Sequence, residues 1–414
     1  MQEENNKNNI QTITFGCRLN TVESEKIAKM LNNIVPMAIV VNTCAVTSEA
    51  ERQSAQYVRR VARENPNNII FVTGCASTHD ANVFTKIPNV RVIDNSEKLN
   101  KDAYIRAIRD FDFSAPFSQI RVTNPDTHMS KQFIQIQNGC NHDCAYCITR
   151  LLRGPSVSYE YDTILNDVRN AVKSGYFEIV LTGVDSASYV KNYNGKPFLI
   201  SDLCRKLLND VPEIQRLRLS SMDPASPEIY KIIDLMHENP RMMPHLHLSM
   251  QSGSDTILKS MRRRHSALMV RDIVSHAKGI TFSWDIICGF PGESDELFNE
   301  TMNLIHDTKP IKIHAFPYSP RPGTPAATMP NQVAKAIAKR RVRDVTDAAT
   351  RNRKDFMTVH IGQITSVLVE ENNTGRTPHD ISVKILGDSV PNRTICDCKI
   401  IGIDGEKFIT VVCK

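Results

Sequence analysis

The sequence predicts an α/β protein with three parts: an N-terminal open α/β domain with a parallel sheet, a central partial (β/α)6 barrel, and a small C-terminal antiparallel β-barrel. The first observation behind this prediction is length, because 414 residues exceed what one domain usually spans. The second is that short apolar runs alternate with segments of helical spacing along most of the chain, which is typical of parallel β/α units. The third is a change to short alternating strands over the last stretch of about 60 residues.

The composition is that of an ordinary globular chain. Hydrophobic residues make up 41% and charged residues 23% of the sequence, which argues against wholesale disorder and against a disulfide-stapled miniprotein. No apolar run approaches the roughly 18 residues of a membrane span, and the first residues, MQEENNKNNI, lack the basic and apolar segments of a secretion signal. We therefore expect a cytoplasmic protein that is not embedded in a membrane.

The N-terminal domain, expected over residues 9–118, contains a repeated strand–helix unit. Short apolar runs, QTITFGC, AIVVNTC and IIFVTGC, end at Cys17, Cys44 and Cys75, and the stretches between them have helical spacing. Parallel strands joined by helices end at one edge of the sheet, where open α/β sheets bind ligands. The three thiols could therefore meet and hold a metal cluster. The alternative is three unrelated thiols in or near a core.

The central domain is expected over residues 126–354, after a Pro-containing linker at residues 114–128. Its strand-like stretches are QFIQIQ, EIVLTG, QRLRLSS, HLHLSM, FSWDIIC and IKIHAFPY. Helix-like segments follow most of them, near 160–174, 200–209, 226–238, 266–278, 294–307 and 331–354. Six β/α units fall short of the eight in a closed barrel, so a partial barrel is predicted. Loops after the strands carry the chemistry in this architecture.

Three cysteines lie close together in the segment CNHDCAYC, with the spacing C-x3-C-x2-C at Cys140, Cys144 and Cys147. Eleven cysteines in a chain without a secretion signal favour metal or redox chemistry over disulfides. His142 falls inside the loop and the next cysteine is Cys204, so no ligand follows at a spacing that would close a zinc site. Three thiolates can hold three irons of a 4Fe-4S cluster and leave the fourth iron open. A zinc knuckle or a group of buried thiols is the alternative.

The C-terminal domain, expected over residues 355–414, has the strand-like stretches IGQITSVLVEE, HDISVKIL, CDCKIIGIDG and KFITVVCK. The helix before it holds eight basic residues against two aspartates, a surplus equal to the net charge of +6 of the whole chain. A solvated helix face is the common meaning of such a run, but its place beside a small β-domain favours contact with a phosphate backbone. The basic residues are Lys335, Lys339, Arg340, Arg341, Arg343, Arg351, Arg353 and Lys354, and a second basic group is Arg262, Arg263 and Arg264.

The remaining cysteines and the single tryptophan are expected to be structural. Core packing is predicted for Cys204, Cys288 and Trp284. Cys396 and Cys398 are predicted on the same face of a strand, because side chains two residues apart point to one side. They could form a metal pair but lack further ligands.

With both sets of cysteines placed, the chain resembles the radical S-adenosylmethionine methylthiotransferases over nearly its whole length. The segments that carry the resemblance are GCRLN, VNTCAVT and VTGCAS near the N-terminus, CNHDCAYC with Tyr146 before its last cysteine, QSGSD and GFPGE, and a tail similar to the TRAM RNA-binding domain. Within the family, GCRLNTVESE and NTCAVTSEA are most similar to the branch that acts on threonylcarbamoyladenosine beside the tRNA anticodon. The chain departs from the family pattern at Arg150, where a proline is common, and in the segment LTGVDSASY.

The resemblance implies an enzyme that converts threonylcarbamoyladenosine in tRNA to its 2-methylthio derivative. It implies two 4Fe-4S clusters: one that cleaves S-adenosylmethionine to a radical, and an auxiliary one that carries the sulfur. The implied ligands are Cys140, Cys144 and Cys147 for the first and Cys17, Cys44 and Cys75 for the second. The implied contacts of S-adenosylmethionine are Tyr146, by the adenine, and Gly183, Ser221 and Gln251, each of which could instead be a plain loop or barrel-lining residue.

The partners that the resemblance implies are the anticodon stem-loop of tRNA, a reducing electron-donor protein and a sulfur source, and a monomer is expected. Two alternatives stay open from the sequence. One is a methylthiotransferase that acts on isopentenyladenosine tRNA or on a ribosomal-protein aspartate. The other is a non-catalytic metal- and RNA-binding protein in which the thiols only staple loops.

Overall fold

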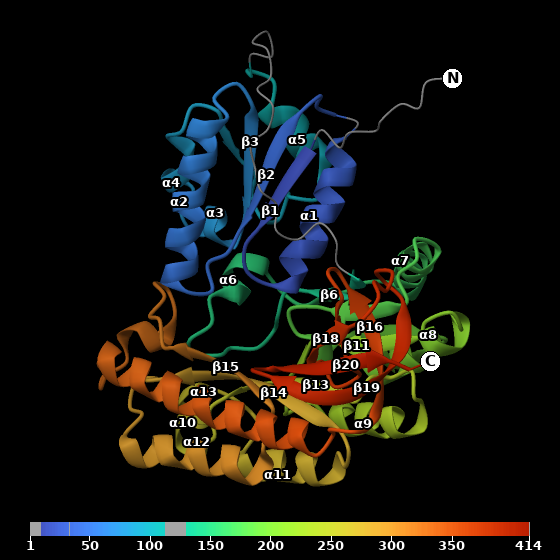
Figure 1. Cartoon of the computed structure of the whole chain (residues 1–414). Coiled ribbons are helices and arrows are strands. Elements are labelled where there is room, and N and C mark those ends of the chain that lie inside the picture. Colours follow the sequence, from blue (N-terminus) through green and yellow to red (C-terminus); the bar gives the residue numbers. More distant parts are fainter. Residues whose placement is uncertain (1–9, 33, 112–129, 414) are drawn as a thin grey trace, which may run out of the picture. The chain divides into compact units, whose positions relative to one another are not determined.

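The structure is a computed structural model of the chain (Figure 1), and it describes residues 10–32, 34–111 and 130–413. The expected linker at residues 114–128 lies outside the described residues. The chain forms two compact units. Unit 1 holds the N-terminal residues together with two later segments, 139–142 and 147–155. Unit 2 holds residues 143–146, the chain from residue 156 onward and the segment that precedes residue 139.

Unit 1 is built on a four-stranded parallel sheet whose strands follow the order of the sequence. They are β1 (Ile10–Thr14), β2 (Ala38–Thr43), β3 (Ile69–Gly74) and β4 (Val90–Val92). β2 and β3 are buried along their whole length, as strands rich in β-branched residues are when both faces of a parallel sheet are covered. The three predicted strands are confirmed.

Helices cover both faces of this sheet (Figure 1). α1 (Arg18–Leu31) and α5 (Lys101–Ala107) contribute to the core on one face, and α2 (Ser48–Glu64) and α4 (Asn82–Thr85) to the core on the other. Alternate residues of one strand serve the two cores: Val40 of β2 faces the first, while its neighbours Ile39 and Val41 face the second.

Unit 2 contains the six predicted parallel strands, and the third of them is divided in two. One sheet has the order β11-β8-β5 and the other the order β12-β13-β14-β15. The strands are β5 (Lys131–Gln135), β8 (Glu178–Thr182), β11 (Arg216–Leu219), β12 (Ser221–Met222), β13 (His245–Gln251), β14 (Thr281–Cys288) and β15 (Lys312–Pro317). The predicted partial barrel is confirmed.

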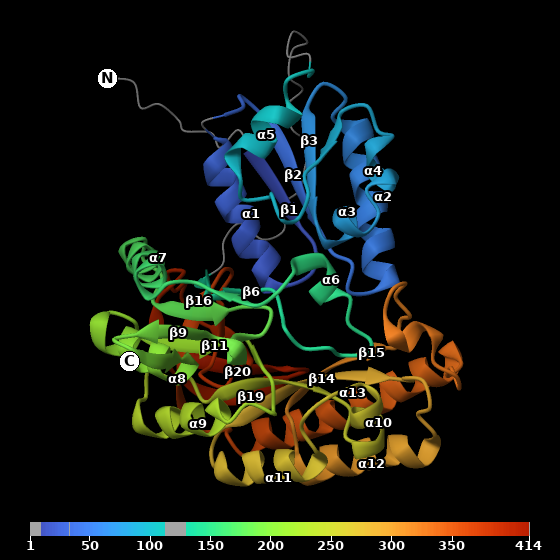
Figure 2. The same cartoon turned by 180° about the vertical axis from the view of Figure 1, so that it is seen from behind.

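The predicted helices of this barrel are also present, and several lie together along its outer face (Figure 2). They are α7 (Tyr161–Lys173), α8 (Ile200–Asp210), α9 (Glu228–Glu238), α11 (Ala267–His276), α12 (Asp295–Thr308) and α13 (Lys335–Thr358). Between helices and strands lies a continuous apolar core that includes Cys204, Cys288 and Trp284, all fully buried. The predicted structural roles of these three residues are thereby supported.

The C-terminal strands close into a five-stranded barrel in the order β16-β17-β18-β20-β19. They are β16 (Ile364–Glu370), β17 (Thr374–Arg376), β18 (Ser382–Leu386), β19 (Ile395–Asp404) and β20 (Lys407–Val412). The sequence predicted that all pairings in this barrel are antiparallel. Four of them are, but the prediction is wrong for β18 and β20, which pair in parallel. The small barrel itself is confirmed.

Two buried arginines of β11 fasten the five-stranded barrel to the partial barrel within unit 2. Arg218 donates hydrogen bonds to the backbone oxygens of Thr377 (2.9 Å) and Pro378 (2.8 Å). Arg216 donates to the backbone oxygen of Arg376 at 3.0 Å. Both arginines also contact Glu178 of β8, which is fully buried. The two barrels therefore form one compact unit, while the division of the chain at residues 354 and 355 stays a prediction.

Candidate functional site

The cysteines at the carboxyl edge of the unit 1 sheet follow three neighbouring strands. Cys17 caps the start of α1 after β1, Cys44 follows β2, and Cys75 follows β3 and begins the short helix α3 (Cys75–His79). Cys44 and Cys75 are buried, at 5% and 7% exposed, and Cys17 is exposed. Burial, with a smaller contribution from the nearby Cys75 and Cys17, raises the pKa of the Cys44 thiol to about 11. The three cysteines, far apart in the sequence, therefore follow neighbouring strands at the same edge of the sheet.

Two glycines make this arrangement of the cysteines possible. Gly16 and Gly74, each directly before a site cysteine, have φ angles of +94° and +98°. A Cβ atom on Gly16 would lie 2.7 Å from the Sγ atom of Cys44, and one on Gly74 would lie 2.4 Å from the backbone oxygen of Thr43. Both the backbone conformation and the space thus require glycine, which gives a physical reason for the Gly-Cys pairs in this part of the sequence.

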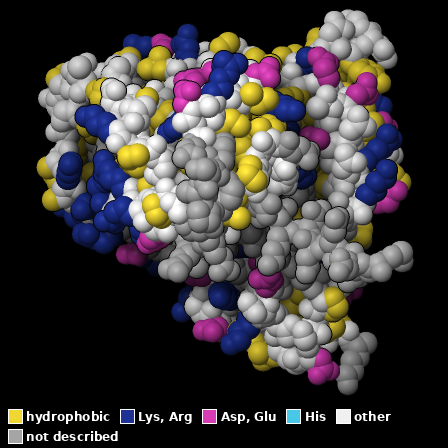
Figure 3. Space-filling model, turned by 90° about the horizontal axis from the view of Figure 1, so that it is seen from above, with side chains coloured by type: hydrophobic (Ala, Val, Ile, Leu, Met, Phe, Trp, Pro, Cys, Tyr) yellow, Lys and Arg dark blue, Asp and Glu magenta, His cyan; other side chains and the backbone are white. Residues whose placement is uncertain are grey.

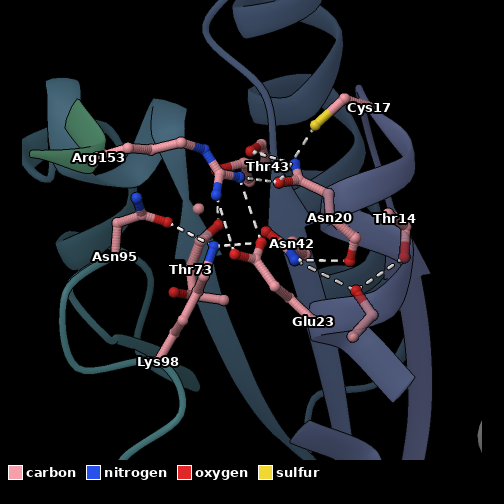
Figure 4. A network of polar contacts seen from close by, with 12 residues as sticks. Thr14, Cys17, Asn20, Glu23, Asn42, Thr43, Thr73, Asn95, Lys98 and Arg153 are labelled. Carbon is pink, nitrogen blue, oxygen red and sulfur yellow. Dashed lines mark hydrogen bonds and ion pairs between the residues drawn. The ribbon is translucent and has the colours of Figure 1, made fainter. Parts of the chain in front are cut away.

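A network of polar side chains lies beside Cys17 in unit 1 (Figure 4). Arg153, on the short helix α6 (Thr149–Arg153), donates from Nη1 to Oε1 of Glu23 at 2.9 Å and from Nη2 to Oδ1 of Asn20 at 2.5 Å. Lys98 forms an ion pair with the same Glu23 carboxylate and donates to Oδ1 of Asn95 at 2.7 Å. Burial alone would raise the pKa of Glu23, but Lys98 and Arg153 outweigh burial and lower it. Glu23 is therefore a buried carboxylate shared by two cations.

This set of thiols and charges suits an iron–sulfur cluster. Thiolates are the ligands that such clusters require, one for each iron that the protein holds. Buried thiols ionise with difficulty, and a metal or a neighbouring cation relieves that cost. Three thiols from three strands, with buried cations beside them, can hold three irons of a cubane and leave the fourth iron open.

The other three cysteines belong to one loop, and its residues are divided between the two units. Cys140 and Cys147 belong to unit 1, and Cys144 belongs to unit 2. The Sγ atom of Cys140 accepts a hydrogen bond from the backbone N–H of His142 at 3.4 Å. In unit 2, the residue after Cys144 is fixed on both sides: Ala145 donates from its backbone nitrogen to Met261 at 3.0 Å, and its oxygen accepts from Ala326 at 2.8 Å.

Arg263 is a residue near this loop that the sequence did not single out for the site. Its side chain is 7% exposed, and it donates from Nη1 toward the Sγ atom of Cys144 at 3.7 Å. It also donates to Oδ1 of Asp223 and to the backbone oxygen of Ser249, both at 2.8 Å. Arg263 is therefore a buried donor to a cysteine of the loop, and its predicted place in a basic surface is wrong.

The neighbours of Arg263 are paired as well. Arg262 forms an ion pair with Asp143, and Arg264 donates to Oδ2 of Asp223 at 2.9 Å. Arg262 and Arg264 remain exposed, at 49% and 57% of their side chains, and exposed ion pairs are weak. The hypothesis of a contact with a phosphate backbone therefore fails for Arg263 alone and stays a prediction for Arg262 and Arg264.

The residues predicted beside S-adenosylmethionine all lie in unit 2. Tyr146 packs edge-on against Phe290, with ring centroids 6.5 Å apart. Gly183 follows β8, and a Cβ atom there would lie 2.7 Å from Oε1 of Gln137. Ser221 follows β11 and Gln251 ends β13 with a φ angle of +68°. The latter three stand at the carboxyl ends of strands of the partial barrel, where a ligand is expected in this architecture, and their contacts with S-adenosylmethionine stay a prediction.

The predicted basic helix, α13, is only partly a charged surface. Arg341 is 3% exposed and pairs with Glu293 at 2.8 Å and Asp295 at 2.7 Å. Arg353 is also buried and pairs with Glu406 at 3.1 Å. These two arginines are structural, which corrects their prediction as RNA contacts. The basic residues of α13 that are exposed are Lys335, Lys339, Arg340, Arg343, Arg351 and Lys354.

Other surface features are less informative. On the face drawn in Figure 3, Lys and Arg side chains gather mainly toward one side, and Asp and Glu are scattered.

In the C-terminal barrel, Cys396 and Cys398 share a face of β19, as predicted, with their Sγ atoms 3.7 Å apart. Across the described residues, no helix combines the length and the apolar character needed to cross a membrane.

Comparison with known proteins identifies two matching families. The model of the Radical SAM superfamily matches residues 134–305, and that of the Uncharacterized protein family UPF0004 matches residues 9–93. A protein of Rickettsia prowazekii (strain Madrid E) named threonylcarbamoyladenosine tRNA methylthiotransferase MtaB is 38% identical and covers 92% of both chains. A protein of the same name from Chlamydia pneumoniae is 31% identical and covers 97% of this chain and 98% of its own.

Among solved structures, the radical S-adenosylmethionine methyltransferase TsrM from Kitasatospora setae, with cobalamin and a [4Fe-4S] cluster bound, aligns with a TM-score of 0.52. It is 13% identical, and the alignment covers 74% of this chain and 69% of that chain. At this identity the likeness concerns the fold alone, and it agrees with the partial barrel of unit 2.

Proposed function

The chain belongs to the methylthiotransferase family of radical S-adenosylmethionine enzymes, and from this premise we propose that it converts threonylcarbamoyladenosine beside the tRNA anticodon to its 2-methylthio derivative. The observation that carries the proposal is the identity of 38%, over 92% of both chains, to a relative named for this substrate. These matches do not favour the alternatives of another methylthiotransferase substrate or of a non-catalytic binding protein. Membership of the family makes the chain an enzyme that uses S-adenosylmethionine and a 4Fe-4S cluster.

We assign the cysteines to two clusters. Cys140, Cys144 and Cys147 hold the cluster that binds S-adenosylmethionine, and Cys17, Cys44 and Cys75 hold an auxiliary 4Fe-4S cluster. When bound, the first cluster with S-adenosylmethionine supplies a radical strong enough to remove an inert aromatic hydrogen, and the second supplies the sulfur. The support for the second assignment is the position of its thiols at the ends of β1, β2 and β3, two of them buried.

The protein side chains contribute positioning and the exclusion of water. Tyr146, held against Phe290, would contact the adenine of S-adenosylmethionine, and Gly183, Ser221 and Gln251 would line its place at the rim of the partial barrel. Arg263 would keep the Cys144 loop in place through its hydrogen bonds to the Cys144 thiol and to Asp223. A radical must be kept from water, and the buried apolar cluster against which Tyr146 packs would serve that purpose; its members are Ala145, Ile257, Met261, Phe290 and Ala326.

The partners follow from the same function. The substrate is the anticodon stem-loop of a tRNA, and the exposed basic residues of α13 and the closed β-barrel beside it are the surfaces that we assign to its backbone. The reaction also needs a reducing electron-donor protein and a sulfur source. We further propose that the chain works as a monomer in the cytoplasm.

Nucleoside mass spectrometry of tRNA tests the proposed substrate. A strain without the gene should lack methylthiolated threonylcarbamoyladenosine and accumulate the precursor. The parent gene should restore the product, whereas Cys17→Ala and Cys140→Ala should not. Loss of the methylthiolated isopentenyl nucleoside instead would assign the chain to the other tRNA branch, and unchanged tRNA would contradict the proposal.

Iron analysis tests the two clusters separately from activity. The anaerobically reconstituted chain should hold about eight iron atoms, at four for each cubane. Replacement of Cys17, Cys44 and Cys75 by alanine together should leave about four. A parent protein with about four iron atoms, unchanged by those replacements, would remove the auxiliary cluster.

A further inference from the structure

The geometry points to Arg153 as a positioning residue of the auxiliary site: its buried guanidinium is the counter-ion and hydrogen-bond donor of the cluster held by Cys17, Cys44 and Cys75. This inference rests on the proposed function, because it requires a cluster on those thiols. It adds a residue that lies outside both sets of cysteines and that comes from the segment after Cys147.

The first argument is how firmly Arg153 is held. Its side chain is 2% exposed, and that of its partner Glu23 is fully buried. Two hydrogen bonds join the guanidinium to both oxygens of Glu23, at 2.9 and 3.2 Å, and a third joins it to Asn20. An arginine that is bound by a carboxylate at two points has a fixed orientation. Arg153 is therefore preorganised before any cluster binds.

The second argument is its contact with the site cysteines. Leu152, the residue directly before Arg153, packs against Cys75, and Arg153 contacts Cys75 through a side-chain hydrogen bond. Asn20, which accepts from Arg153, also lies 3.9 Å from the Sγ atom of Cys17. Arg153 thus connects Glu23 with Asn20, which lies beside Cys17, and with Cys75.

The third argument is charge. Of the described side chains that are joined in this network, Lys98 and Arg153 are cations and Glu23 is the carboxylate between them. A buried group of charges with one positive charge in excess is costly unless an anion balances it. Three thiolates around a doubly positive cubane core carry one net negative charge, so the cluster would supply that anion. The network and the cluster complement each other.

The fourth argument is the anchoring of the helix that carries Arg153. Leu152 packs against Ala45, Cys75 and Ala76, and its backbone oxygen accepts a hydrogen bond from Asn95 at 2.8 Å. Arg150, on the same short helix, is exposed. The helix therefore presents Arg153 to the cysteines and Arg150 to solvent, and Arg150 offers a matched control.

The test uses the full chain with Cys140, Cys144 and Cys147 replaced by alanine, so that only the auxiliary cluster forms. Hydrogen bonds and net positive charge at a cluster favour its reduced form. Arg153→Gln should therefore lower the midpoint potential, measured by redox titration followed by electron paramagnetic resonance. It should also weaken iron retention against a chelator, by roughly tenfold as for other residues that support metal ligands.

Two further variants separate this role from a general loss of structure. Arg153→Lys should keep part of both properties, because it keeps the charge, and Arg150→Gln should match the parent. Glu23→Gln removes a negative charge from the network and should shift the potential upward, opposite to Arg153→Gln. Iron content and circular dichroism of each variant would be measured in parallel.

The outcomes are distinguishable. If Arg153→Gln keeps the parent's potential and iron retention, the inference is overturned while the auxiliary cluster stands. If Arg153→Gln and Glu23→Gln shift the potential in the same direction, the charge argument is wrong. If the chain without the three loop cysteines binds no iron, the auxiliary cluster of the proposed function fails, and the inference fails with it.

Discussion

At the scale of single residues, the proposed auxiliary site depends on two glycines as well as on its cysteines. Gly74 has a φ angle of +98°, and an added Cβ atom would meet the backbone oxygen of Thr43 at 2.4 Å. Neither the added Cβ atom on β3 nor the Thr43 oxygen on β2 can move without displacing its strand. A thiol can therefore follow β3 at this place only because the residue before it has no side chain.

The variant Gly74→Ala should destabilise unit 1 and impair cluster binding. A strained backbone conformation of this kind costs about 1–3 kcal/mol, and the clash with Thr43 adds to it. Denaturant unfolding and iron content after reconstitution would measure the two effects. Gly195→Ala is the control, because its φ angle of +78° imposes similar strain but open space surrounds it. Equal loss of iron in both variants would contradict a specific role for Gly74.

The sequence did not indicate which of its charged residues are buried. Arg153 and Arg263 are buried donors beside cysteines, yet in the sequence they stand in ordinary polar segments. Their partners are distant: Glu23 lies 130 residues from Arg153, and Asp223 lies 40 residues from Arg263. Only the fold decides that a particular arginine is enclosed and paired, so local spacing could not predict these two.

At the scale of elements, α13 separates into a structural side and a charged side. Ala338, Val345 and Ala349 are buried. Arg341 is also buried and forms ion pairs with Glu293 and Asp295. Arg340 and Arg343 lie on the exposed side, where Arg340 forms a weak surface ion pair with Asp295 at 3.3 Å. One helix thus holds basic residues with two different roles.

These roles predict different results for neighbouring substitutions. Arg340→Gln with Arg343→Gln should weaken tRNA binding and reduce its dependence on salt, by a slope of about one for each phosphate that the helix no longer neutralises. Arg341→Gln should instead lower the free energy of unfolding by roughly 3 kcal/mol, because it leaves the buried Glu293 without its cation. Binding isotherms at several salt concentrations and denaturant unfolding would check this. An effect of the double variant on stability alone would refute the assignment to RNA.

Most elements could be predicted from the sequence because their patterns are strong. Apolar runs rich in β-branched residues indicated β2, β3 and the strands of the partial barrel, and helical spacing indicated α2 at its observed bounds. The missed strands are short: β4 and β17 have three residues each, and the hairpin strands β9 (Val190–Tyr193) and β10 (Lys196–Leu199) have four each. Such segments form strands because a neighbouring strand pairs with them, which a local pattern does not reveal.

At the scale of the whole molecule, unit 2 contains neutral histidines in its interior. His245 is 9% exposed and is bonded to the hydroxyls of Thr281 at 2.8 Å and Ser283 at 3.0 Å. Burial lowers the pKa of His245 to about 3 and that of the buried His265 to about 4. Both must therefore be uncharged in the folded protein near neutral pH.

Unit 2 should consequently lose stability in mild acid. In the folded protein the pKa values of His245 and His265 lie below the ordinary value of 6.5. The stability that these two neutral histidines contribute is therefore fully present above pH 6.5 and is lost as the pH falls toward about 4. The loss should reach about 1.4 kcal/mol per pH unit for each histidine. Trp284, the single tryptophan, is fully buried in unit 2, so its fluorescence follows this unit during denaturant unfolding.

The variant His245→Gln supplies the control for this measurement. Its amide can bond the same hydroxyls but does not titrate, so the decline of its unfolding free energy between pH 6.5 and pH 4 should be shallower. The cluster-free chain would be used throughout, so that acid does not act through lost iron. Parallel pH profiles of parent and variant would exclude His245 as a source of the acid sensitivity.

The attachment of the five-stranded barrel has a consequence for how such proteins can diversify. Arg216 and Arg218 grip main-chain oxygens of Arg376, Thr377 and Pro378, and every amino acid offers that oxygen. These bonds therefore set no requirement on the side chains at residues 376–378, whereas the bond from Arg216 to the Ser366 hydroxyl, at 2.9 Å, depends on the side chain. The exposed side chains of the five-stranded barrel can therefore change to fit a differently shaped nucleic acid, while the hydrogen bonds from Arg216 and Arg218 are retained.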